Sequence, residues 1–298
     1  RGYSKNKLHV DVFDIEDRAK PKMEYNYSML GYYTDARMIG DYVYTISNEN
    51  ARYDYPVPMY EVNGVAKQMS IGDIYYFDYA GGYNFNTISA IDLDNGEFNS
   101  KVYLLDNSGS IYVSQDNIYL TREKWIEHET ETKKIIEEGI IPILPEEKKQ
   151  EAEGIMSGNK NLNEKYNEIN KMVQEYSNSL RGNGKSDFDE NLRDSIQRVQ
   201  IELERERMKT EINKINVDGL NIRYEGEGEV PGRVLNQFSM DEHNGYFRIA
   251  TTSGESWQGT SVNNLYVLDK DLKVVGKVEG LAPGESIYSI RFMGKRAY

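Results

Sequence analysis

The 298-residue sequence contains no cysteine, and this absence excludes disulfide bonds and cysteine-ligated metals. Histidine is nearly absent as well, since His9, His128 and His243 are the only copies and lie far apart along the chain. That spacing argues against a histidine-based metal site or catalytic triad. No run of about 18 apolar residues occurs, so we expect no segment of this chain to span a membrane.

Basic residues are also few relative to acidic ones. The 36 Lys and Arg residues against 49 Asp and Glu residues give a formal net charge of −13. We therefore expect neither nucleic acid nor an anionic membrane as the main partner, because both favour a basic stripe. No charged-then-apolar leader precedes Leu8, so we expect any signal segment to lie outside this sequence.

Motifs for catalysis are missing too. The sequence has no glycine-rich phosphate loop before a helix and no nucleophile elbow. Asp92–Glu97 superficially resembles a calcium loop, but it lacks the ligand spacing and the distal Glu, so we interpret it as a hairpin turn. Acidic pairs that would suit a glycosidase are too plentiful to single out. The sequence therefore predicts no catalytic residue, no cofactor and no metal ligand.

What is present is a repeated hairpin. Arg37–Tyr44 and Arg291–Tyr298 share an Arg, two large apolar residues, Gly, two turn positions, a small apolar residue and Tyr. Weaker copies lie at Tyr112–Tyr119 and Phe238–Tyr246. Each is typical of a short strand, a tight turn and a second strand. Because one hairpin cannot bury its own apolar face, four similar ones indicate a repeat architecture.

Each repeat has two strands, a connection, and two more strands joined by an Asp-containing turn. The interval from Phe238 to Phe292 is about 50 residues, which is typical of a four-stranded propeller blade. The helical sequence forms one block and does not alternate with strands, which disfavours a doubly wound sheet. We predict an all-β fold: a β-propeller of four-stranded blades, with about four blade equivalents and an α-helical hairpin insertion.

Three segments follow from this pattern: propeller blades over residues 1–121, the helical insertion over 122–209, and further blades over 210–298. Apolar residues recur at helical spacing over Leu162–Leu180. A second helix is predicted after the N-cap Ser186-Asp187. This helical hairpin either braces or covers the propeller, mediates oligomerisation, or docks a partner.

Three enlarged connections occupy the same slot, after the second strand of a blade: residues 48–83, 122–209 and 252–263. We expect residues 48–83 to form a long ordered loop, and all three connections to lie on one face. Insertions in repeat proteins commonly mark the binding face.

Aromatic residues are concentrated in these connections. Tyr and Trp combine a large contact area with a polar group, which suits recognition of carbohydrate or peptide. The alternative is that the rings pack the long loop onto the blades. The candidate ligand-binding aromatics are Tyr53, Tyr55, Tyr60, Tyr75, Tyr76 and Trp257.

Two arginines at equivalent repeat positions, Arg37 and Arg291, are the remaining candidates. Both fall on predicted innermost strands, near Asp35 and Ser289. One interpretation is a polar lining of the central channel that holds a carboxylate or a sugar. The other is an ion pair or hydrogen bond with a neighbouring blade that fixes blade packing.

Distinctive stretches lie at residues 33–40, 230–242 and 280–285, and residues 142–146 and 175–180 extend the pattern into the insertion. In these stretches the chain resembles the secreted prokaryotic, largely archaeal, β-propeller domain family that is distantly related to WD-40 repeats. The resemblance implies a secreted or surface-displayed propeller and supplies no catalytic residues. Family members continue for several blades beyond the position of Tyr298, so we expect this chain to be a truncated part of a larger ring. The alternative is a four-bladed ring in which Leu8–Met29 closes on Ile287–Tyr298.

These features predict a non-enzymatic extracellular binding or scaffold protein that holds a polysaccharide or a protein ligand on its insertion-bearing face. One rival is a propeller glycoside hydrolase or lyase, which would need a carboxylate cluster at the channel mouth. Another is a structural cell-surface component that assembles with itself. The sequence leaves the oligomeric state open.

Overall fold

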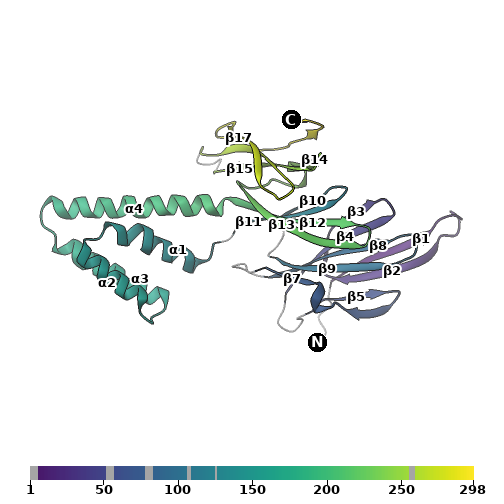
Figure 1. Cartoon of the computed structure of the whole chain (residues 1–298), viewed down its shortest axis with the longest axis horizontal. Coiled ribbons are helices and arrows are strands. Elements are labelled where there is room, and N and C mark those ends of the chain that lie inside the picture. Colours follow the sequence, from purple (N-terminus) through teal and green to yellow (C-terminus); the bar gives the residue numbers. More distant parts are fainter. Residues whose placement is uncertain (1–5, 52–56, 78–82, 106–108, 125, 255–258) are drawn as a thin grey trace. The chain divides into compact units, whose positions relative to one another are not determined.

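A computed structural model of the chain describes residues 6–51, 57–77, 83–105, 109–124, 126–254 and 259–298. The chain divides into a β-sheet unit, Arg1–Glu123 with Lys209–Tyr298, and a helical unit, Lys124–Met208. Figure 1 shows both units and labels α1 to α4 and those strands for which there is room.

The β-sheet unit is built from four antiparallel four-stranded arrays, which we call blades 1 to 4. Blade 1 has the strand order β1 (Lys7–Asp14), β2 (Lys22–Leu30), β5 (Met59–Val62) and β6 (Val65–Gln68). Blade 2 has the order β3 (Tyr32–Ile39), β4 (Tyr42–Asn50), β8 (Asn84–Asp92) and β9 (Phe98–Leu105), and β7 (Ile74–Tyr76) pairs in parallel with β9.

The two later blades follow sequence order. Blade 3 consists of β10 (Ser110–Val113), β11 (Asn117–Glu123), β12 (Lys209–Asp218) and β13 (Asn221–Pro231). Blade 4 consists of β14 (Met240–His243), β15 (Tyr246–Ser253), β16 (Val262–Leu268) and β17 (Val274–Leu281). A two-stranded hairpin, β18 (Phe292–Met293) and β19 (Arg296–Ala297), comes after blade 4. The predicted fold class, four-stranded β-propeller blades with a helical insertion, is confirmed.

The prediction of a long loop over residues 48–83 is wrong in its described part. The segment supplies β5 and β6, and β5 pairs with β2 through Tyr27↔Val62 and Met29↔Tyr60. Blade 1 therefore receives its outer hairpin from the connection between β4 and β8 of blade 2. The hairpin turns at Asn63-Gly64, where both residues have positive φ, as a two-residue turn between right-twisted strands requires.

Apolar cores lie between successive blades, because each sheet buries one face against the next. Blades 1 and 2 enclose Tyr27, Met29 and Ile91. The core between blades 2 and 3 is larger and includes the fully buried Ile88, Tyr103, Ile118 and Ile215. Blades 3 and 4 share a third core that includes Tyr119, Ile212, Phe247, Ile249 and Tyr266.

The helical unit lies in sequence between two paired strands of blade 3. β11 and β12 pair from Asn117↔Asn216 to Glu123↔Thr210, and Arg122 forms a buried ion pair with Glu211 beside the point where the chain leaves the sheet. The unit contains α1 (His128–Lys134), a π-helical segment η2 (Ile135–Ile140), a 3₁₀ turn η3 (Ile141–Ile143), α2 (Glu146–Ser157), α3 (Leu162–Ser179) and α4 (Asn183–Arg207). Its own core is centred on Ile136, Ile140, Ile169 and Val173.

The N-termini of α3 and α4 are formed in different ways. Asn161 caps α3, since its side chain accepts from Glu164 N and the Glu164 side chain accepts from Asn161 N, which forms a capping box. The predicted N-cap at Ser186-Asp187 is wrong: α4 begins at Asn183, after Gly182, which has a positive φ. A glycine that reverses the chain directly before the helix places Ser186 inside its first turn.

Within the described residues, the closure expected for a four-bladed ring is not formed. β1 and β2 belong to a sheet with β5 and β6, while β18 pairs with β19. The C-terminal hairpin is held to blade 4 by Arg248, whose Nη1 donates to Gly294 O at 2.7 Å.

Candidate functional site

An open cavity of about 250 Å³ lies among the first strands of blades 2, 3 and 4 and the C-terminal hairpin. Each of these four elements contributes part of the wall. The lining residues are Arg37, Ile111, Tyr112, Val113, Gln237, Phe238, Met240, Asp241, Arg291 and Phe292. We call this cavity the central pocket.

The central pocket brings the four sequence repeats together. Arg37, Tyr112, Phe238 and Arg291 are the first residues of the four repeated hairpins, and all four line the pocket. Equivalent positions in successive blades therefore face a shared space. Of the eight predicted ligand-binding residues, Arg37 and Arg291 are the pair that the structure places in this pocket.

The guanidinium group of Arg37 is held by its own strand. Its Nη1 donates to Asp35 Oδ1 at 2.5 Å and to Ala36 O at 2.8 Å. Asp35 Oδ1 also accepts from the Ala36 backbone N–H at 2.8 Å, and among the described residues its buried Oδ2 has no hydrogen-bond partner. Arg37 thus lines the pocket with its charge already balanced, and its hydrogen-bond partners come from β3, not from a neighbouring blade.

Arg291 differs from Arg37 in this respect. Its guanidinium carbon lies 5.2 Å from the centre of the Phe238 ring, a cation–π contact, and no described carboxylate pairs with it. Its backbone N–H and C=O pair with those of Tyr298, which fixes the base of the side chain. Arg291 is therefore a positioned cation without a carboxylate partner among the described residues.

A third arginine, Arg248, holds the acidic residue of the pocket wall, Asp241. It donates to Asp241 Oδ2 from Nε at 2.9 Å and from Nη2, and its guanidinium stacks over Phe292, 5.0 Å from the ring centre. Among the lining residues, two arginines, Arg37 and Arg291, stand against one carboxylate, Asp241, whereas the whole chain carries a net charge of −13.

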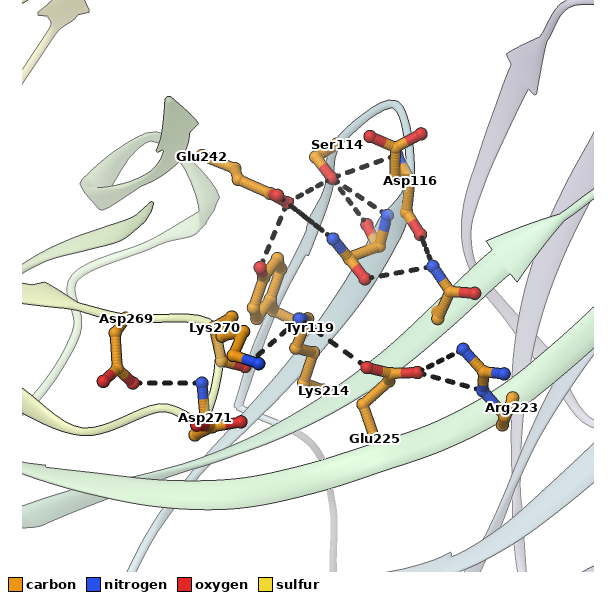
Figure 2. Close-up of polar contacts among 12 residues, drawn as sticks. Ser114, Asp116, Tyr119, Lys214, Arg223, Glu225, Glu242, Asp269, Lys270 and Asp271 are labelled. Atoms are coloured by element: carbon orange, nitrogen blue, oxygen red, sulfur yellow. Dashed lines mark hydrogen bonds and ion pairs between the residues drawn. The ribbon is translucent and has the colours of Figure 1, made fainter. Parts of the chain in front are cut away.

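A polar network at the interface of blades 3 and 4 fixes Tyr112 and β14. Figure 2 shows the carboxylate of Glu242, which accepts from Ser114 Oγ at 2.6 Å, Asn117 Nδ2 at 3.0 Å and Tyr119 OH at 3.0 Å. The backbone N–H of Glu242 donates to Tyr112 OH at 3.0 Å. Burial, reinforced by the Glu242 carboxylate, raises the pKa of Tyr119 far above its ordinary value. Glu242 therefore sets the position of the pocket residues Asp241 and Tyr112 on either side of the interface.

The same figure shows a second contact between these blades. Lys214 Nζ donates to Lys270 O at 3.3 Å and lies 4.0 Å from Glu225 Oε2, while Arg223 binds Glu225 at 2.6 Å. The bond from Lys214 to Lys270 joins the turn between β16 and β17 to blade 3, and the contacts of Glu225 lie within blade 3.

The predicted aromatic residues do not form one surface in the described structure. Tyr60 stacks on Phe98 at 4.9 Å, and Tyr75 stacks on the buried Tyr103 at 5.1 Å. Tyr76 is exposed, and its hydroxyl lies 3.0 Å from that of Tyr83. Tyr53, Tyr55 and Trp257 lie outside the described residues.

Tyr60 also lines a second cavity, of about 240 Å³, on blade 1. The Lys7 ammonium lies 2.6 Å from Glu61 Oε1 there, and Ser28 Oγ donates to Glu61 Oε2 at 2.9 Å. Lys7 and Ser28 together hold the pKa of Glu61 below its ordinary value. Because its charged groups already satisfy each other, this cavity offers a ligand less than the central pocket does.

The sequence analysis did not propose the other eight pocket residues, of which five are polar or aromatic: Tyr112, Gln237, Phe238, Asp241 and Phe292. Tyr112 and Phe238 could have been predicted from the sequence, because they occupy the same position in the repeat as Arg37 and Arg291. Asp241 and Gln237 could not have been predicted in this way, since the fold alone brings them into the same pocket as the arginines. In the part of the chain that the structure describes, no three His, Asp or Glu side chains gather to hold a metal ion. No described helix is long and apolar enough to cross a membrane.

Successive four-stranded blades packed face to face, with a shared pocket among their first strands, define a protein of the β-propeller class. The sequence model of the family described as "Beta propeller domain" matches residues 2–298, and the chain belongs to that family.

Two relatives come from archaea, and both carry the name uncharacterized protein. The one from Methanocaldococcus jannaschii is 30% identical over 297 residues, which cover 97% of this chain and 46% of the relative. The one from Archaeoglobus fulgidus is 30% identical over 269 residues, which cover 89% of this chain and 42% of the relative. The chain thus spans less than half the length of these relatives.

Proposed function

We propose that this β-propeller domain is a non-enzymatic binding or scaffold module that recognises a polysaccharide or a protein ligand outside the cell. The observation that carries the proposal is the central pocket, in which Arg37, Tyr112, Phe238 and Arg291 converge from four repeats. A small set of polar groups among aromatic walls is typical of ligand sites.

The pocket supports binding better than hydrolysis. Glycoside hydrolases generally need two carboxyl groups on either side of the scissile bond. The described lining of the central pocket contains one acidic residue, Asp241, and Arg248 binds one of its oxygens. A cationic group without a carboxylate partner, Arg291, favours recognition of an anionic group on the ligand.

The extracellular location rests on the resemblance of three sequence stretches to a secreted propeller family. Cleavage of the protein by a protease added to intact producing cells tests it. Protection from the protease until the cells are lysed would contradict it.

The function itself is tested by binding of the purified domain to arrays of glycans and peptides, beside three variants. The first is Arg291→Met, which removes the pocket cation. The second changes Tyr53, Tyr55 and Tyr60 to Ala, which tests the aromatic connection. The third, Arg223→Met, removes an exposed arginine on β13 and serves as the charge-matched control.

We expect a ligand whose binding is lost in Arg291→Met and kept in the control. Binding lost instead in the tyrosine variant would move recognition to the connection between β4 and β8. If neither the parent domain nor any variant binds an array member, the proposal of a recognition module falls.

A further inference from the structure

The central pocket offers more than a positive charge, and its other polar groups narrow the ligand class. The guanidinium carbon of Arg291 lies 5.2 Å from the centre of the Phe238 ring, and a cation over a ring face keeps its N–H groups as donors to a ligand. Those donors match the two oxygens of a carboxylate, which a guanidinium binds in a bidentate manner. Since no described carboxylate forms an ion pair with Arg291, an anionic group on the ligand is its expected partner.

Asp241 places a hydrogen-bond acceptor in the same pocket. Both bonds from Arg248 end on its Oδ2, and no described residue donates to Oδ1. A free carboxylate oxygen attracts hydroxyl groups and repels a second anion. A ligand that is anionic throughout, such as a run of acidic amino acids, would therefore meet repulsion beside Arg291.

Gln237 adds both kinds of hydrogen-bonding group. Its side-chain amide supplies two N–H donors and a carbonyl acceptor at the pocket wall, next to Phe238. Donor and acceptor groups close together suit hydroxyls, because each hydroxyl both donates and accepts. The side chains of Phe238, Phe292 and Met240 supply the apolar wall.

The size of the pocket sets a further limit. A volume of about 250 Å³ is below the roughly 300–1,000 Å³ of cavities that hold drug-sized ligands. It suits a single ring with its substituents, not several residues of a chain. A sugar carrying one carboxylate combines this size with the required anion and hydroxyls.

We infer that the central pocket binds a uronic acid residue of an acidic polysaccharide, with the carboxylate on Arg291 and ring hydroxyls on Asp241 Oδ1 and Gln237. This inference rests on the proposed binding function and names its ligand class. Arg37, whose charge Asp35 balances, lines the same pocket.

The test uses ligands that differ in one property. Calorimetric titration compares an oligogalacturonate with its methyl ester, which keeps the ring and hydroxyls and loses the charge. Oligoglutamate of equal charge represents an acidic protein, and a neutral glucan represents uncharged polysaccharide. The variants are Arg291→Met, Asp241→Asn, Gln237→Ala and the control Arg223→Met.

We expect the oligogalacturonate to bind, and its methyl ester to bind at least about tenfold more weakly, as loss of a charge-assisted hydrogen bond implies. Arg291→Met should produce a similar loss, and the control should not. Asp241→Asn should weaken uronate binding as well. If that variant unfolds because Arg248 loses its partner, Gln237→Ala gives the same readout from an amide that carries no described hydrogen bond.

Two results would overturn the inference in distinguishable ways. Oligoglutamate or neutral glucan that binds through Arg291 as tightly as the uronate would remove the sugar assignment and leave the binding function in place. Absence of binding to every member of the panel would remove both.

Discussion

Single glycines in the outer turns determine how closely adjacent blades approach. Gly96 lies in the turn between β8 and β9 with φ of +72°, against the ring of Tyr25, and Tyr27 OH donates to its carbonyl at 2.9 Å. The next interface repeats this arrangement with Gly219, which lies against Tyr42 and accepts from Tyr44 OH at 2.8 Å. At both interfaces, two tyrosines on the second strand of one blade thus contact the outer turn of the next blade.

We predict that Gly96→Ala destabilises the β-sheet unit much more than Gly40→Ala. Both glycines have positive φ, +72° and +58°, so both variants carry the backbone strain of a left-handed alanine, about 1 kcal/mol. A Cβ on Gly96 would lie 2.4 Å from the Tyr25 ring, whereas Gly40 has no atom within 4 Å. Overpacking should therefore cost Gly96→Ala roughly 2 kcal/mol more. Urea unfolding of the two variants measures the difference, and equal losses would show that the turn does not depend on this contact.

At the scale of secondary-structure elements, sequence periodicity predicted most strands and failed where an element depends on distant partners. The strands at Lys7–Asp14 and Tyr42–Asn50 have strong alternation or aromatic residues, and their hairpins end in recognisable turns. β5 and β6 have four residues each, and the pairing of β5 with β2 joins residues more than 30 positions apart, from Met29↔Tyr60 to Tyr27↔Val62. The Asn63-Gly64 signal was present, but nothing local indicated that its hairpin completes blade 1.

The helical unit should be removable without loss of the β-sheet unit. β11 pairs along its full length with Thr210–Asn216 of β12, and the buried Arg122–Glu211 ion pair lies near the end of this pairing. Among the described residues, the two cores that blades 2, 3 and 4 share contain no member of the helical unit. We predict that replacement of residues 124–209 by a two-residue Asn-Gly turn, which joins the paired Glu123 and Thr210, leaves a cooperatively folding sheet protein.

Near-ultraviolet circular dichroism and urea unfolding would measure this, with the full chain as reference. Retained near-ultraviolet signal and a single unfolding transition are expected. A variant that loses the tyrosine signal of the interblade cores would show that blade 3 needs the helices to fold.

At the scale of the whole molecule, sequence alone predicted one part of the candidate site. The repeat placed Arg37 and Arg291 at equivalent positions, and the structure brings both to one pocket. The aromatic residues of the connection were the weaker part, because Tyr60 and Tyr75 stack on Phe98 and Tyr103 instead of lining that pocket. Composition signals the need for aromatic contacts but cannot tell ligand surface from interior packing.

Tyrosines buried in the cores between the blades make the stability of the β-sheet unit sensitive to alkaline pH. Burial raises the pKa of Tyr44 from 10.0 to about 12, and it raises the pKa of Tyr27, Tyr103, Tyr119 and Tyr266 in the same direction. When the pKa of a phenol is higher in the folded state than in the unfolded state, its contribution to folding stability is fully present at pH values below the unfolded-state pKa. The stabilisation is then lost as pH rises from about 10 through the folded pKa. For Tyr44 the loss is on the order of 2 kcal/mol by pH 12.

We therefore predict a steep fall in unfolding free energy between pH 10 and 12, and a smaller fall in Tyr103→Phe. Among the described residues the buried Tyr103 hydroxyl has no hydrogen-bond partner, so phenylalanine keeps the packing, removes one ionisable group and leaves stability at pH 7 unchanged or about 1 kcal/mol higher. Tyr288→Phe is the control, because that side chain is 91% exposed and lies outside the interblade cores. Urea unfolding at pH 7, 10 and 11 measures all three proteins. A Tyr103→Phe profile parallel to the parent would mean that the ring leaves the interblade core before its hydroxyl ionises.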